Sequence, residues 1–220
     1  MLNLTTELEQ PHTNKYNNIK RKMIPEKEFL NLFLKIGLLK KVQRTGWVLK
    51  GVKDVESVAE HTWRVAMPAL ILAPQLKLDQ HKLVKMALIH DLGEIDIGDM
   101  KWESGKKIIG SQKKKHQDEH KAIKKIFTDN PSFRKYVQLW EEFNQQETKE
   151  AKILKQIDKL ETAIQALEYQ KEGYPPEWFD EFWENAEKYL KNQELEPYFR
   201  FLEKQRKNFC TMCNKHEKVQ

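Results

Sequence analysis

The stretch ALIHDLGEIDIGD, residues 87–99, decides the fold, because it places a histidine and an aspartate on a segment with the apolar periodicity of a helix. His90 continues the stripe formed by Leu83 and Ala87, and Asp91 continues the adjoining stripe. Burying an imidazole or a carboxylate without a partner costs free energy. The stretch therefore predicts a helical protein with a polar site in its interior.

Two further predicted helices carry polar residues on apolar faces. His61 lies in register with Val65, in a helix that starts behind the capping-box spacing of Ser57 and Glu60. Asp158 lies on the apolar side of the segment with the clearest helical pattern. A single buried histidine is commonly a satisfied core residue, which is the alternative for each position alone. A divalent cation is a partner that all four residues can share, and the pattern predicts a metal site of His61, His90, Asp91 and Asp158.

Helical periodicity accounts for most of the remaining chain, and no segment has the alternation typical of a strand. Helices are predicted after Pro25 and over residues 57–72, 79–90, 112–127, 133–143, 151–169 and 178–190, with a loop over 44–55. We expect an all-α protein, a compact single-domain helical bundle over residues 24–200. A disordered lead-in over 1–23 and a basic tail over 201–220 are expected to flank it.

Composition narrows the class of protein. The 220 residues are 39% apolar and 33% charged, which is typical of a globular protein with a charged surface. No run approaches the roughly 18 apolar residues of a membrane span, and the polar N-terminal segment lacks the apolar core of a signal peptide. These features favour a cytoplasmic location. The net charge of +6 fits an anionic small substrate or a solvated surface better than nucleic acid, because both signs are mixed along the chain.

Cys210 and Cys213 form a C-x-x-C pair that His216 follows. A zinc site needs a second pair of ligands at matching spacing, and none lies nearby. The sequence favours reduced thiols and assigns them no role.

The order His61, His90-Asp91, Asp158 resembles the H…HD…D pattern of the HD-domain metal-dependent phosphohydrolases. The flanking text is similar to the 5'-deoxynucleotidase branch of that family, in RTGWVLKGVKDVESVAEHTWRVAM (44–67), ALIHDLGEIDIGD (87–99) and LWEEFNQQETKEAKILKQIDKLETAIQALEY (139–169). The resemblance spans roughly residues 29–169 and implies an HD-domain helical bundle with these four residues as metal ligands.

The resemblance also implies roles for residues around the metal. Glu94 would assist catalysis, and Arg44 would orient the substrate phosphate, which suits the donor geometry of a guanidinium. Asp99 would contact the substrate, and Trp47 would lie near the sugar and disfavour a 2'-hydroxyl. A second cation held by Glu94 and Asp99 is an alternative use of those carboxylates.

The activity that the resemblance implies is hydrolysis of 2'-deoxynucleoside 5'-monophosphates by a homodimer. The divalent cation is not identified by the ligand set, which accepts Mn, Co, Fe, Zn, Ni or Mg. Two alternatives stay open: an HD phosphohydrolase acting on a triphosphate, an alarmone or a cyclic nucleotide, and a non-catalytic basic helical protein that binds nucleic acid.

Overall fold

The computed structural model describes residues 24–99, 103–104, 107–108, 111–127 and 131–216, so the expected lead-in over 1–23 lies outside the described residues. The helices are α1 (Glu26–Ile36), α2 (Thr45–Val48), α3 (Val58–Gln75), α4 (Gln80–Ile89), α5 (Glu94–Ile97), α6 (Gln112–Phe127), α7 (Arg134–Gln145), α8 (Lys149–Lys171), α9 (Asp180–Leu190) and α10 (Glu196–His216). Short 3-10 segments are η2 (Gly37–Lys41), η3 (Pro131–Phe133) and η4 (Pro176–Phe179). The described strands are the two-residue antiparallel pair β1 (Glu103–Ser104) and β2 (Lys107–Ile108), so the all-α prediction is confirmed.

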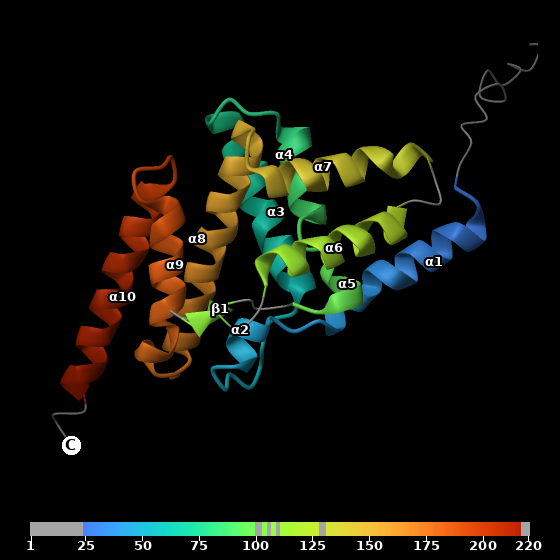
Figure 1. The fold of residues 1–220 in the computed structure, drawn as a ribbon. Coiled ribbons are helices and arrows are strands. Elements are labelled where there is room, and N and C mark those ends of the chain that lie inside the picture. Colours follow the sequence, from blue (N-terminus) through green and yellow to red (C-terminus); the bar gives the residue numbers. More distant parts are fainter. Residues whose placement is uncertain (1–23, 100–102, 105–106, 109–110, 128–130, 217–220) are drawn as a thin grey trace, which may run out of the picture.

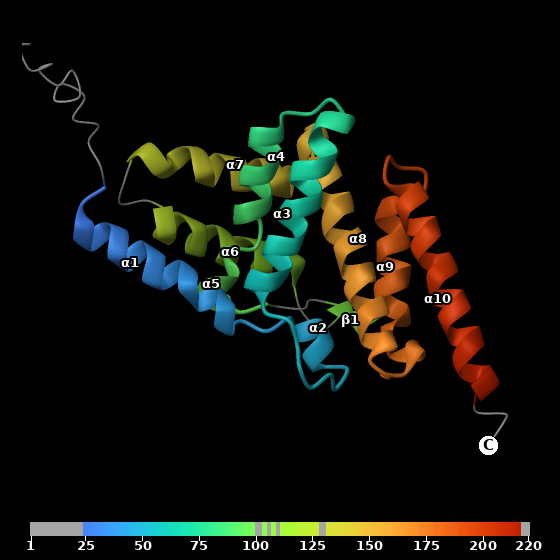
Figure 2. The same ribbon diagram turned by 180° about the vertical axis from the view of Figure 1, so that it is seen from behind.

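Helix α8 is central to the bundle. Both ribbon views place it between α3 and α9, with α10 beyond α9 at one end of the molecule and α1 at the other (Figures 1 and 2). The larger hydrophobic core gathers side chains from α3, α4, α8, α9 and α10 around α8. Its fully buried members include Met86, Leu154 and Phe199. Packing in this core fixes how α3, α4 and α8, which carry the predicted ligands, are shifted and rotated relative to one another.

A second, smaller core joins η2, α6 and α7 through Leu39, Ile123 and Trp140. The indole Nε1 of Trp140 donates a hydrogen bond of 3.0 Å to the backbone oxygen of His90, at the end of α4. The polar segment around His90 therefore lies where the two cores meet.

Side-chain caps start the three helices of the site. The predicted capping box is confirmed: Ser57 Oγ accepts from the backbone N–H of Glu60, and the Glu60 carboxylate accepts from the backbone N–H of Ser57. Asp79 caps α4 and Thr148 caps α8 in the same way, each accepting a backbone N–H three residues on. Such caps stabilise a helix by about 1 kcal/mol and fix its first residue. They set the register of His61, His90 and Asp158.

The segment expected as a loop over 44–55 contains the one-turn helix α2, and the prediction was wrong there. The backbone N–H of Thr45 donates to Asp99 Oδ2 at 2.7 Å, and the Thr45 hydroxyl donates to the Asp99 backbone oxygen. Trp47 enters the larger core, only 1% exposed. The hydrogen bonds of Thr45 and the burial of Trp47 stabilise this helical turn.

Helix α10 continues through position 201, where the basic tail was expected to start. Phe199 is buried, Leu202 packs against the larger core, and Arg206 donates to the backbone oxygen of Pro176 at 3.1 Å. These contacts extend the helix beyond the expected boundary. Cys210, Cys213 and His216 fall in α10, and their side chains lie outside the described part of the structure. None of the described helices has the length and apolar composition needed to cross a membrane.

Candidate active site

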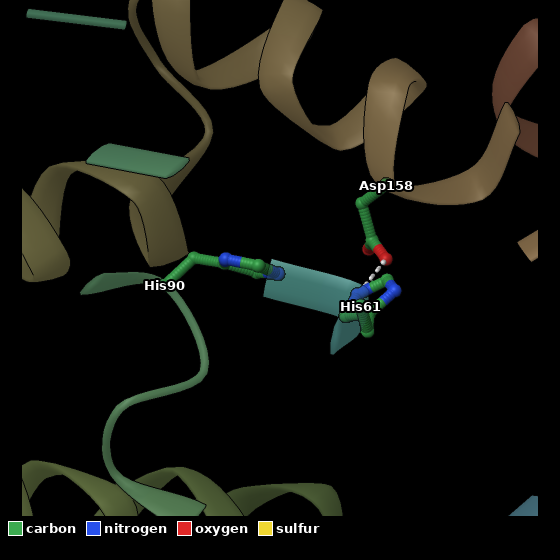
Figure 3. A group of neighbouring side chains, drawn as sticks. All are labelled: His61, His90 and Asp158. Atoms are coloured by element: carbon green, nitrogen blue, oxygen red, sulfur yellow. Dashed lines mark ion pairs between the residues drawn. The ribbon is translucent and has the colours of Figure 1, made fainter. Parts of the chain in front are cut away.

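Three helices bring a cluster of potential metal ligands together at the centre of the bundle. His61 comes from α3, His90 follows the last residue of α4, and Asp158 comes from α8 (Figure 3). One ligand atom from each lies within 4.8 Å of the others, and all three side chains are buried. His61 Nε2 is 3.4 Å from Asp158 Oδ1. Residues 97 positions apart in the chain thus meet because α3 packs on α8.

Asp91 lies at the same cluster. Its Oδ2 atom is 3.2 Å from His90 Nε2 and 3.5 Å from His61 Nε2. The structure therefore brings together all four residues that the sequence selected as ligands. Two imidazoles and two carboxylates form a mixed nitrogen and oxygen set, which suits a divalent transition metal or Mg.

The hydrogen bonds of the two imidazoles show that the residues fit a metal. His90 Nδ1 is 2.7 Å from the backbone oxygen of Ala87, which can only accept, so Nδ1 carries the proton and Nε2 carries the lone pair. His61 Nδ1 likewise lies 2.5 Å from Glu161 Oε2. Both Nε2 atoms are buried, and neither has a hydrogen-bond partner in the described chain. A buried nitrogen left in this way costs about 1–3 kcal/mol, and a shared cation removes that cost.

A second layer of side chains, which the sequence did not predict, holds the ligands in place. Arg64 Nε lies 3.2 Å from Glu161 Oε1, so an α3 arginine fixes the carboxylate that orients His61. Lys155 and Lys159 lie 3.0 and 3.4 Å from Asp158 Oδ2, which leaves Oδ1 facing His61. The sequence signal for Lys155 and Lys159 is their closeness to the predicted ligand Asp158 in the same helix, α8.

Charge interactions keep the carboxylates ionised inside the protein. Burial raises the pKa of Asp158, but Lys159, Lys155 and His61 outweigh it and hold that pKa well below its ordinary value. Burial and Arg44 lower the pKa of His61, but Glu161 and Asp158 raise it by more. Together they raise the pKa of His61 to about 10. The carboxylates around His61 therefore favour a cation in the cluster.

Glu94, the first residue of α5, is 2% exposed and faces the same space. Its Oε1 lies 3.2 Å from Lys115 Nζ, and its buried Oε2 has no hydrogen-bond partner among the described residues. Burial raises the pKa of Glu94 well above its ordinary value, and Asp91 and Asp99 add to the shift. A carboxyl group whose pKa is raised in this way is suited to proton transfer.

Lys115 of α6 is a site residue that the sequence analysis missed, because it lies in a helix whose charges looked like a solvated face. Its ammonium lies 3.2 Å from Glu94 and 4.0 Å from Asp99, and Glu119 Oε1 is 3.4 Å away. The Lys115 ammonium therefore lies near both Glu94 and Asp99, the two carboxylates that were considered as ligands of a second cation.

Arg44 is close to the predicted metal ligands. Its Nη1 lies 3.4 Å from Asp91 Oδ2 and its Nη2 lies 3.5 Å from Thr162 Oγ1. A half-buried guanidinium beside the cluster can bind an oxyanion there.

Trp47 lies deeper than its expected role suggests. Its indole N–H donates to Glu56 Oε1 at 2.9 Å, and the Phe182 ring lies over it with centroids 4.0 Å apart. Only its margin borders the cavity, so Phe182 is the larger aromatic surface there.

One cavity of about 220 Å³ joins these groups. Its lining includes Asp91, Asp158, Glu94, Asp99 and Arg44, together with residues of α9. The other lining residues are Gly46, Trp47, Lys115, Lys155, Lys159, Thr162, Glu181, Phe182, Glu184, Asn185 and Lys188.

The fold and the site define a helical metal-binding protein with a cavity lined by acidic and basic side chains. Residues 36–196 match the family model described as HD domain. The 5'-deoxynucleotidase HDDC2 of Danio rerio is 36% identical over 69% of this chain and 74% of its own length. A conserved hypothetical protein from Pyrococcus furiosus superposes with a TM-score of 0.65 at 37% identity, covering 81% of this chain and 99% of that one. A predicted metal-dependent phosphohydrolase from Magnetospirillum magnetotacticum gives 0.62 at 26% identity, with 85% and 98% covered.

This chain belongs to the HD domain family. It is a metal-dependent hydrolase by that membership, and the cluster of His61, His90 and Asp158 is able to bind the metal.

The Glu161–His61 contact predicts a loss of metal affinity without loss of a ligand. Glu161→Gln should weaken metal binding by about 10- to 100-fold, because the amide no longer polarises His61 Nδ1–H as a carboxylate does. Titration calorimetry with Mn²⁺ measures the change. Glu168→Gln is the matched control, since Glu168 also pairs with Arg64, at 2.7 Å, but is exposed. Asp158→Ala should hold no metal. Equal affinity of Glu161→Gln and the unmodified protein would contradict the assignment.

Proposed function

We propose that this protein is a cytoplasmic 5'-deoxynucleotidase that hydrolyses 2'-deoxynucleoside 5'-monophosphates to deoxynucleoside and phosphate. The observation that carries the proposal is one cavity lined by Arg44, Glu94 and the predicted ligands Asp91 and Asp158, of which Asp158 belongs to the buried cluster with His61 and His90. Relatives from fish to Dictyostelium with the name 5'-deoxynucleotidase HDDC2 support the choice of substrate class, at 33–36% identity.

His61, His90, Asp91 and Asp158 would hold the metal. When bound, a divalent cation supplies Lewis-acid activation of water and of a phosphoryl oxygen. Arg44, which lies beside Asp91 and Thr162, would bind the substrate phosphate and align it with the cluster. The guanidinium neutralises charge on the phosphoryl oxygens as the phosphorus–oxygen bond breaks.

Glu94 would act as the acid–base group of the reaction. It can take a proton from the attacking water and return one to the 5'-oxygen of the leaving nucleoside. Lys115 holds its Oε1, and its buried Oε2 has no hydrogen-bond partner among the described residues. Asp99 would contact the substrate. A second cation bound by Glu94 and Asp99 would have to displace the Lys115 ammonium.

Glu94→Gln should reduce kcat by about two to four orders of magnitude, because the amide cannot transfer the proton. The metal content should stay at the level of the unmodified protein. Glu119→Gln is a matched control: Glu119 also contacts Lys115 but does not line the cavity. Phosphate release and metal analysis on both variants provide the test. A rise in KM at constant kcat would make Glu94 a binding residue.

The sugar distinguishes this proposal from a general phosphatase. The wall of the cavity beside α2 is formed by the margin of Trp47 and by Phe182, which offer no hydrogen bond to a 2'-hydroxyl. Leaving that hydroxyl desolvated costs about 1–3 kcal/mol, or about 10- to 100-fold in kcat/KM. We expect dAMP to exceed AMP by this factor, and dGMP to exceed GMP similarly. Equal kcat/KM within both pairs would remove the deoxynucleotide assignment.

We further propose that the protein is a homodimer. Helix α3 exposes an apolar stripe of Trp63, Met67, Leu70 and Ile71, spaced at i, i+4, i+7 and i+8. A contiguous exposed stripe with a tryptophan is typical of homodimer interfaces, which are more apolar than the general surface.

Sedimentation should give twice the monomer mass of 26.3 kDa. The double variant Trp63→Glu, Ile71→Lys should be monomeric and folded, since both side chains lie on the surface. Phe201→Glu is the matched control, because Phe201 on α10 is exposed to the same 63% as Trp63. A monomeric unmodified protein would refute the dimer, and an unaffected double variant would refute the interface.

A further inference from the structure

Helix α9 forms part of the wall of the cavity, and the proposed function uses only Phe182 of it, beside the sugar. Five of its residues line the cavity along one face of the helix: Glu181, Phe182, Glu184, Asn185 and Lys188. The proposed function places the phosphate of a substrate beside Arg44, close to the metal ligands Asp91 and Asp158. The rest of a nucleotide must therefore extend into the space that α9 closes.

Phe182 occupies a fixed position in this wall. Its ring stacks on Trp47 at 4.0 Å between centroids and 32° between planes. It also lies so close to Gly46 that a Cβ atom at that position would meet the ring at 2.9 Å. Glycine at position 46 permits this approach, and the ring there is half-buried and borders the cavity.

Asn185 lies one helical turn after Phe182 and borders the same space. Its amide carries both donors and an acceptor, so it can pair with the edge of a purine or of a pyrimidine. The neighbouring Glu181 is engaged by Lys50 Nζ at 3.3 Å. An aromatic face and a neutral amide side by side match the two surfaces of a nucleobase, its π-face and its polar edge.

We propose that Phe182 and Asn185 form the nucleobase-binding wall of this site, with the base stacked on Phe182 and its edge hydrogen-bonded to Asn185. The inference rests on the proposed deoxynucleotidase function and adds the residues that recognise the base. Stacking on an aromatic ring tolerates every base. The wall therefore accepts all four bases, with modest preferences set by Asn185.

The test compares nucleotides with a substrate that lacks only the base. We would measure kcat/KM for dAMP, for thymidine 5'-monophosphate and for 2-deoxyribose 5-phosphate. Phe182→Leu keeps an apolar group against Gly46 but removes the π-face. It should lower the ratio of kcat/KM for dAMP to that for deoxyribose 5-phosphate by about tenfold. Asn185→Ala should change the ratio of dAMP to thymidine monophosphate by a few-fold.

Trp178→Leu is the control, because Trp178 is a neighbouring aromatic residue that packs against the core and does not line the cavity. It should leave both ratios unchanged. Equal losses on all three substrates in Phe182→Leu would show a structural role and overturn the base wall, as would unchanged ratios in both α9 variants. If the unmodified protein hydrolyses deoxyribose 5-phosphate as well as dAMP, the wall is wrong and the phosphohydrolase stands. If it hydrolyses no deoxynucleotide, the proposed function fails and this inference fails with it.

Discussion

Two imidazole nitrogens, buried without a hydrogen-bond partner among the residues that the structure describes, impose the constraint on which the rest of the structure depends. The rings of His61 and His90 lie 5.5 Å apart, and each is fixed through its Nδ1 atom so that Nε2 faces the cluster. An apolar interior penalises such atoms, so the helices must be held by other interactions. The larger core holds α3 and α8, and Trp140 of the smaller core holds the backbone at His90.

The charges around this constraint are arranged in two groups. Asp158 is held by Lys155 and Lys159 on its own helix, whereas Glu94 is held by Lys115 from α6. Each anionic group therefore has a cationic neighbour even before a metal is bound. This arrangement lets the protein fold with acidic and basic side chains together around one cavity.

The helices and the metal cluster could be predicted from the sequence because both follow from helical periodicity. His61, His90 and Asp158 each continue an apolar stripe, and a stripe in a bundle faces the interior. Lys115 could not be found in this way, since its helix reads as a charged surface. It reaches the site because α5 and α6 approach closely at Gly93, where a Cβ atom would lie 3.1 Å from the backbone oxygen of Glu119. The burial of Trp47 depends in the same way on Phe182, which is 135 positions away.

Helix α8 carries an unusual share of the site: Asp158, the anchor Glu161, the Arg44 partner Thr162 and two lysines lie within eight consecutive residues. The positions of all these side chains depend on the rotation of α8 about its own axis. An insertion of a single residue between Thr148 and Lys155 would turn this face by about 100°. The length of α8 before Lys155 is thus more tightly constrained than the identity of its residues, and we expect lineages of this family to vary there by substitution rather than by gaps.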